Sequence, residues 1–269
     1  MALTAAQIDA AARSLDEAER TQKQVGLISL QYPDMDMEDA YAIQAAWMKL
    51  KAAAGRVTIG RKIGLTSKAM QAALNIDIPD SGILLDDMRF ADGASIPRDR
   101  FIQPRIEAEI AFVMKSDLRG PNVTQFDVLN ATDYITPALE ILDTRILRAD
   151  PETGTARNVY DTISDNAANA GIVTGGRPIR PNEADMRWIG AIVSRNAEVI
   201  ETGLGAAVLN HPAMGVAWLV NRLAEYGDGL SAGEVVLSGS FIRPIEAVPG
   251  STIVGDYGPF GTVSVYFEH

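Results

Sequence analysis

The chain has 269 residues, 47% of them hydrophobic, which is enough to bury a full core as one large domain or as a domain with a small appendage. Its formal charge of −11 disfavours nucleic acid as a partner, because the protein's own field repels a polyanion. Cysteine is absent, which excludes disulfides, thiolate metal sites and a cysteine nucleophile. The chain shows neither a basic leader nor an apolar run of membrane-spanning length, so we expect a cytoplasmic protein without a membrane partner.

Residues 1–56 are predicted to form a helical region. Thr4 opens a capping-box pattern before an Ala- and Leu-rich helix that should run from Ala5 to about Gln24. A second helix should begin near Asp36, because apolar residues then recur at three- and four-residue spacing. Gly55 is placed to end this second helix. We assign no chemistry to either helix.

From Val57 the hydrophobic period changes to two, which predicts a strand. Lys62 points away from the apolar face of this strand, between Gly60 and Gly64, which leave room around it. A lysine in that position can approach a substrate closely. The alternative is an ordinary exposed lysine on a strand.

A short helix over about Met70 to Leu74 is expected next, followed by a turn from Ile78 to Gly82. Asp80 lies within that turn. It is either an aspartate that shapes the turn or an acid that a rigid loop presents.

Two carboxylates are predicted to lie side by side on the next strand, which runs from Ile102 to Met114. Its apolar residues alternate with Glu107 and Glu109, which therefore project from the same face. Close like charges are costly unless a cation neutralises them, and a hard divalent cation prefers oxygen ligands. With Glu140 from a later strand, the set suits octahedral Mg²⁺ or Mn²⁺. The alternative is the solvated face of an edge strand with Arg105 as ion-pair partner.

Later segments carry weaker signals. Thr124 should cap a helix to about Ala131, and Pro137 should lie near a sheet edge or in the first residues of the strand that carries Glu140. The aperiodic stretch 144–160 reads as a surface loop or lid. The small and amide residues of 164–171 either approach a ligand or form an ordinary loop before a strand.

The last third predicts a hairpin about Asn196 and a helix capped by Asn210, with His211 in its first turn and in a structural role. Several short β-branched runs follow it. Helices first and many strands afterwards indicate an α+β architecture, and no nucleotide-binding motif is present.

Taken together, several short motifs resemble the hydratase and decarboxylase branch of the fumarylacetoacetate hydrolase superfamily. Each motif is weak alone, but their order and spacing match over nearly the whole chain. They are Gly60-Arg-Lys62-Ile-Gly-Leu-Thr-Ser67, Pro79-Asp80-x-Gly82, Pro104-Arg-Ile-Glu107-Ala-Glu109, Ala138-Leu-Glu140, Ser164-Asp-Asn166 and Leu237-Ser-Gly-Ser240.

The resemblance implies an N-terminal helical region over 1–56 and a mixed β-roll catalytic domain over 57–269. It implies a Mg²⁺ or Mn²⁺ ion held by three carboxylates, which are Glu107, Glu109 and Glu140. Relatives of this kind form homo-oligomers, and we expect the same tendency here.

The remaining site residues also follow from the resemblance. Lys62 and Asp80 are expected to move protons, and Ser164 and Asn166 to hold a substrate carboxylate. No residue is assigned to the distal carboxylate.

The implied reaction is the addition of water to a seven-carbon dicarboxylate that carries a 2-hydroxy-2,4-dienoate group. The resemblance assigns this reaction to the meta-cleavage of homoprotocatechuate. Two alternatives are a decarboxylase of the 4-oxalocrotonate type and a non-catalytic partner subunit. The hydrolase branch fits less well, because it activates water with a histidine near the N-terminal part of the site. This chain has no histidine before His211.

Overall fold

The computed structural model describes residues 2–67, 71 and 78–269, so the helix expected over Met70 to Leu74 lies outside the described residues except at Gln71. Among the described residues, the helices are α1 (Ala5–Thr21), α2 (Ile28–Gln31), α3 (Met37–Ala53), α5 (Gln125–Ala131), α6 (Val159–Ser164) and α7 (Pro212–Ala224). In these ranges, no helix is long and apolar enough to cross a membrane.

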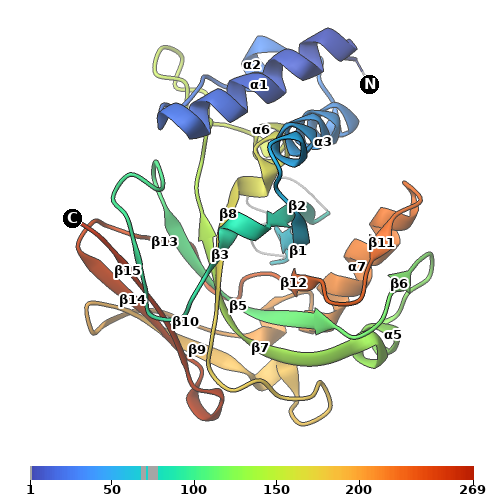
Figure 1. Cartoon of the computed structure of the whole chain (residues 1–269), viewed down its shortest axis with the longest axis vertical. Helices are drawn as coiled ribbons and strands as arrows, with labels where there is room; N and C mark the ends of the chain where they lie inside the picture. The colour runs from blue at the N-terminus through green and yellow to red at the C-terminus, as the bar shows by residue number, and fades with distance from the viewer. Residues whose placement is uncertain (1, 68–70, 72–77) are drawn as a thin grey trace.

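The strands form one large sheet and one smaller sheet, together with a separate two-stranded ribbon (Figure 1). The larger sheet has eight strands, in the order β2-β1-β12-β5-β7-β8-β3, with β13 paired to β5. Its strands are β1 (Thr58–Gly64), β2 (Asp80–Leu85), β3 (Arg89–Phe90), β5 (Arg105–Met114), β7 (Thr132–Leu142), β8 (Asn169–Thr174), β12 (Val235–Leu237) and β13 (Ile245–Glu246). Two of its pairings are parallel, β1 with β12 and β3 with β8.

The smaller sheet has the order β10-β9-β14-β15-β4, and β6 pairs with β11 in a separate ribbon. The remaining strands are β4 (Ala94–Ile96), β6 (Leu118–Arg119), β9 (Gly190–Arg195), β10 (Glu198–Leu204), β11 (Gly229–Leu230), β14 (Ser251–Asp256) and β15 (Thr262–Phe267). Short 3-10 turns are η1 (Asp86–Met88), η2 (Asn166–Ala168), η3 (Met186–Trp188), η4 (Gly205–Ala207) and η5 (Gly258–Phe260). Helices before a mixed sheet confirm the predicted α+β class.

The helical region forms as its caps predict. Thr4 and Asp36 accept hydrogen bonds from backbone N–H groups three residues along, and α1 and α3 begin directly after them. Their apolar faces share one buried cluster with Leu85, Ile146 and Ile163 from the rest of the chain. Because that core is shared, a division into two domains after residue 56 stays a prediction.

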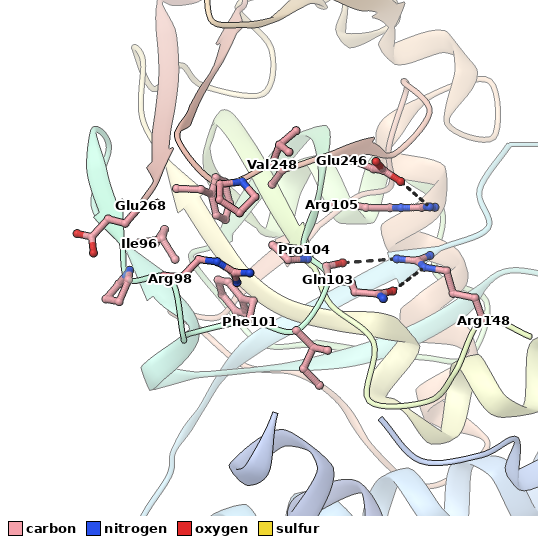
Figure 2. Close-up of a pocket in the computed structure, with 15 residues that line it drawn as sticks. Ile96, Arg98, Phe101, Gln103, Pro104, Arg105, Arg148, Glu246, Val248 and Glu268 are labelled. Carbon is pink, nitrogen blue, oxygen red and sulfur yellow. Dashed lines mark hydrogen bonds and ion pairs between the residues drawn. The ribbon is translucent and has the colours of Figure 1, made fainter. Parts of the chain in front are cut away.

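Strand β5 lies in the interior of the large sheet, between β12 and β7, so the edge-strand alternative for its glutamates is wrong. Ile106, Ala108 and Ile110 are buried in the main core, as the alternation predicted. Arg105 is not the partner of the glutamates either, because its Nη2 lies 3.5 Å from Glu246 Oε1 in a separate pocket (Figure 2).

Three local predictions need correction. Residues from Asp80 onward form strand β2 rather than a turn, because they pair with β1 in an antiparallel register. Pro137 lies in the middle of a central strand. Proline has no N–H to donate to a neighbouring strand. The Pro137 carbonyl accepts from Gly175 N–H, which follows the last residue of β8. The backbone of Pro137 therefore faces the side where β8 has already ended, and the β7–β8 ladder needs no N–H from it. Helix α7 is capped by His211, not by Asn210.

The two ends of the large sheet approach each other, which gives the roll its closed shape. Asn166, in the turn η2 that leads into β8, accepts from Ile83 N–H and donates to Ile83 O on β2. Asn169 donates to the same carbonyl. Together these three bonds connect β2 with the start of β8, although the two strands are not neighbours in the ladder.

Candidate active site

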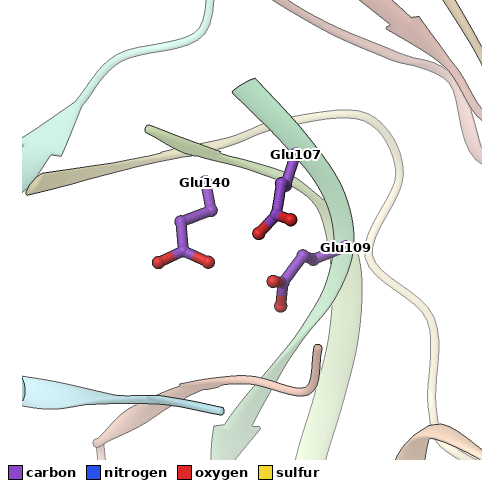
Figure 3. Close-up of side chains that lie close together, drawn as sticks. All are labelled: Glu107, Glu109 and Glu140. Carbon is purple, nitrogen blue, oxygen red and sulfur yellow. The ribbon is translucent and has the colours of Figure 1, made fainter. Parts of the chain in front are cut away.

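The register between β5 and β7 explains why three glutamates meet. Glu107 pairs directly with Glu140 across the two antiparallel strands, and Glu109 is two residues farther along β5 on the same face. One carboxylate oxygen from each residue lies within 4.8 Å of the others. Figure 3 shows the three side chains converging from the two strands.

These carboxylates are placed where their charges are costly. Glu109 and Glu140 are fully buried, and Glu107 is partly buried. Burial and the neighbouring charge of Glu140 raise the pKa of Glu107 to about 8 and raise the pKa of Glu109 well above its ordinary value. Burial also raises the pKa of Glu140, although Lys62 opposes that change.

The donor set fits a divalent metal ion. Within the described residues, Glu109 Oε1 and Glu140 Oε2 are buried without a hydrogen-bond donor, and Glu140 Oε1 has only the Lys62 ammonium near it, at 3.4 Å. Buried polar atoms normally have partners, so these oxygens are those expected of ligands to a hard cation. The other oxygen of Glu109 is fixed at 2.8 Å by the N–H of Gly239.

Lys62 lies beside the glutamates. Its side chain is almost fully buried, and its Nζ lies 3.4 Å from Glu140 Oε1. Burial by itself disfavours the ammonium ion, but the charges of Glu140 and Asp80 outweigh it and raise the pKa of Lys62 above its ordinary value. The alternative of an exposed strand lysine is therefore wrong.

The side chains of Asp80 and Lys62 both extend over the Cα of Gly64. In the β1–β2 ladder Gly64 pairs with Asp80, and a Cβ added to Gly64 would lie 2.2 Å from Asp80 Oδ1 and 3.0 Å from Lys62 Nζ. Only glycine leaves this space free. Asp80 is 2% exposed, and burial raises its pKa against the opposing charges of Lys62 and Arg157.

A cavity of about 380 Å³ opens onto this group of residues, and Lys62, Asp80 and Glu107 line it. Such a volume suits a small-molecule site. Neither Ser164 nor Asn166 is among its lining residues. Ser164 Oγ is buried, and the amide of Asn166 bonds to Ile83 as described above.

Several residues of the site were not singled out from the sequence. Gly239 and Tyr257 position Glu109: the first donates to its side chain, and the tyrosine hydroxyl contacts its backbone N–H and C=O. Arg157 lines the cavity, although it belongs to the stretch expected to be a surface loop. Only the quoted motif Leu237-Ser-Gly-Ser240 pointed towards Gly239, and no periodic signal pointed to the other two.

A second pocket of about 400 Å³ shares no lining residue with this cavity. Arg98, Arg105 and Arg148 lie around it (Figure 2). None of the three glutamates lines this second pocket, whereas Glu107 lines the smaller cavity, which is therefore the candidate active site.

A curled mixed sheet that carries a buried carboxylate triad beside a lysine and an aspartate defines an enzyme site of the fumarylacetoacetate hydrolase-like fold. The chain is 58% identical over 256 residues to a 2-oxo-hept-4-ene-1,7-dioate hydratase of Escherichia coli, covering 95% of this chain and 96% of the relative. It is 40% identical over 266 residues to a 2-keto-4-pentenoate hydratase of Paraburkholderia xenovorans (strain LB400), covering 99% and 97%.

Among solved structures, 4-oxalocrotonate decarboxylase from Pseudomonas putida G7, complexed with magnesium and adipate, superposes with a TM-score of 0.93. It is 35% identical, and the match covers 98% of each chain. No family model matches the sequence. The chain belongs to the hydratase and decarboxylase family of the fumarylacetoacetate hydrolase superfamily, which confirms the resemblance drawn from its motifs.

Proposed function

We propose that this protein is a divalent-metal-dependent hydratase that converts 2-oxohept-4-ene-1,7-dioate to 4-hydroxy-2-oxoheptanedioate in the meta-cleavage of homoprotocatechuate. The observation that carries the proposal is the cluster of three glutamates beside Lys62, with Lys62, Asp80 and Glu107 lining one cavity. This arrangement occurs in a chain 58% identical to a hydratase named for that substrate.

Glu107, Glu109 and Glu140 would hold the metal ion, which we propose to be Mg²⁺ or Mn²⁺ because all three ligands are hard oxygens. When bound, the ion supplies Lewis-acid polarisation of the C1 carboxylate and the C2 oxygen of the substrate. The protein holds its ligands in place beforehand, through the β5–β7 register and the N–H of Gly239.

Lys62 and Asp80 are proposed as the catalytic residues that move protons. The 2-hydroxy-2,4-dienoate form loses its hydroxyl proton and gains one at C5, which leaves a double bond between C3 and C4 conjugated to the C2 carbonyl. Water oxygen then adds at C4, and a proton returns to C3. In this proposal Asp80 orients and deprotonates that water, and the buried Lys62 ammonium donates the proton.

Other expectations stay predictions. Ser164 and Asn166 were expected to bind a carboxylate, but both lie outside the lining of the cavity, and Asn166 already bonds to Ile83. Homo-oligomer formation and cytoplasmic residence are likewise predictions that rest on the sequence alone.

Decarboxylation is the second candidate, because the fold neighbour of TM-score 0.93 is a decarboxylase. Both reactions begin from the same 2-oxo acid, so the glutamates do not discriminate between them. Hydration is favoured by Asp80, which provides a proton acceptor buried beside Lys62 in the cavity. A non-catalytic partner subunit is disfavoured, because all three glutamates and Lys62 are present.

The test is a reaction in ¹⁸O-labelled water with purified protein, Mg²⁺ and 2-hydroxyhepta-2,4-dienedioate. We expect 4-hydroxy-2-oxoheptanedioate with the label at C4 and no CO₂. Stoichiometric CO₂ release without a labelled C4 hydroxyl in the immediate product would assign the decarboxylase reaction instead.

A further inference from the structure

Arg157 is a buried cation in the wall of the proposed active site. Its side chain is 16% exposed, and it lines the cavity together with Lys62, Asp80 and Glu107. The segment that carries it is held in place, because Arg157 N–H donates to Arg148 O and Ala149 pairs with Ala156 in an isolated bridge. The guanidinium is therefore presented by ordered backbone.

The charge of Arg157 is only partly matched by its surroundings. Its Nη1 donates to Thr144 Oγ1 and lies 3.9 Å from Asp165 Oδ2. Asp165 is already engaged by Arg145, whose Nε lies 2.5 Å from Oδ1 and whose backbone N–H donates to Oδ2. Within the described residues, both polar contacts of the Arg157 guanidinium use Nη1. The rest of the fork is available to an acceptor in the cavity.

The charged groups of the cavity follow an order that matches the substrate. The glutamates act on Lys62, and Asp80 interacts with both Lys62 and Arg157. Asp80 is among the charges that act most strongly on Arg157, whereas no glutamate of the triad is, although Glu107 lines the same cavity. A substrate with C1 and C2 at the glutamates and C4 near Asp80 would direct its far end towards Arg157.

We propose that Arg157 is a specificity-determining residue that binds the distal carboxylate of a dicarboxylate substrate. This inference rests on the proposed function, since it concerns the same cavity. A guanidinium fork donates two parallel hydrogen bonds to a carboxylate, and a desolvated site strengthens them. Burial lowers the pKa of Arg157, and a carboxylate partner would relieve the unfavourable burial of its charge.

Arg243 is the competing cation of the same cavity, and its surroundings differ. Its side chain is 80% exposed, and its Nη2 and Nε both bond to Glu201 Oε1, at 2.7 and 3.0 Å. An exposed guanidinium that already has a carboxylate partner gains little from a second one. Arg243 thus provides a matched control within the same cavity.

The experiment compares Arg157→Gln, Arg157→Lys and Arg243→Gln on two substrates, 2-hydroxyhepta-2,4-dienedioate and the monocarboxylate 2-hydroxyhexa-2,4-dienoate. For Arg157→Gln we expect KM for the diacid to rise by about 10- to 100-fold, with kcat and the monoacid KM nearly unchanged. Arg157→Lys should recover part of the loss, and Arg243→Gln should leave the ratio of the two substrates unchanged. The assignment would be overturned if Arg157→Gln lost activity equally on both substrates or lost none. It would also be overturned if Arg243→Gln, and not Arg157→Gln, changed the preference between the two substrates.

A binding measurement removes the dependence on turnover and on the folding of the variant. Calorimetry with the wild-type protein should show tighter binding of 2-oxoheptanedioate than of 2-oxoheptanoate, neither of which has a double bond to hydrate. Equal affinity of the wild type for the two would overturn the role of Arg157. A wild type that binds the diacid selectively but hydrates neither dienoate would instead contradict the proposed function and leave this assignment standing.

Discussion

Glu107 and Glu140 stand directly opposite each other on adjacent antiparallel strands, in the interior of the large sheet. Like charges in that relationship destabilise a sheet, and here Glu140 is fully buried and Glu107 is partly buried. The two carboxylates therefore repel each other in the metal-free protein, and a bound cation would replace this repulsion with attraction of both carboxylates to the cation. Metal binding and stability are expected to be linked at this site.

The first prediction concerns Glu109→Gln. An amide is a poorer ligand for a hard cation, so activity should fall by roughly 100-fold or more. The wild type should lose thermal stability on chelation and regain about 2.7 kcal/mol in Mg²⁺ or Mn²⁺ at 100 times the dissociation constant. This regain should be absent from Glu109→Gln. The exposed Glu246→Gln is the control, and full turnover with full metal affinity in Glu109→Gln would refute the three-glutamate site.

The second prediction separates binding from chemistry at Lys62. Lys62→Met should retain most of its affinity for Mn²⁺, because no ligand oxygen is removed, while the chemical step measured in single turnovers should fall by roughly 100-fold or more. Titration of Mn²⁺ followed by electron paramagnetic resonance gives the affinity. If the variant loses the metal, Lys62 is a support for Glu140 rather than a catalytic residue.

A third prediction uses the space above Gly64. Gly64→Ala should reduce activity by roughly 100-fold with near-normal folding, because its Cβ would lie 2.2 Å from Asp80 Oδ1 and displace that side chain. The matched control is Gly26→Ala, where the added Cβ meets no atom within 4 Å. Steady-state kinetics and thermal denaturation of both variants provide the measurement. Wild-type kinetics in Gly64→Ala would show that Asp80 need not occupy this position.

The fourth prediction is a pH dependence of stability at the start of α7. His211 Nδ1 accepts the N–H of Ala213 as the helix cap, and burial lowers the pKa of His211 below its ordinary value of 6.5. The unfolded chain then binds more protons, so the cap's contribution is complete above pH 6.5 and is lost as pH falls through the folded pKa.

The measurement compares urea unfolding of the wild type with His211→Asn between pH 7.5 and 5. Asparagine caps helices without titrating, so the wild type should lose about 1 kcal/mol more than the variant over that range. A difference that does not change with pH would show that protonation of His211 leaves the cap intact.

The local part of the site could be predicted from the sequence, because strand periodicity determines which side chains share a face. Alternation was sufficient to place Glu107 and Glu109 together and to turn Lys62 away from the core. The confirmed caps at Thr4 and Asp36 have the same local origin. In each case the decisive contacts lie within a few residues of the chain.

The non-local part could not be predicted in this way. The composition of residues 78–82 favours a turn, so the sequence predicts that Asp80 lies in one. Only the pairing of β2 with β1 makes it a strand residue. Asn166 was expected to meet a ligand, but its amide is used to connect β2 with the start of β8. Arg157 lies in an aperiodic segment, where no pattern indicates burial.

Strand β12 has a consequence for the order in which the site can be made. Val235–Leu237 lies between β1 and β5, although it follows both by more than a hundred residues of chain. During synthesis, the strands that carry Lys62 and the glutamates leave the ribosome without the strand that separates them. Because chains emerge from the N-terminus first, the completed metal and proton-transfer site must wait until nearly nine-tenths of the polypeptide is exposed. A truncated or stalled chain is therefore unable to form the active centre, whatever metal concentration surrounds it.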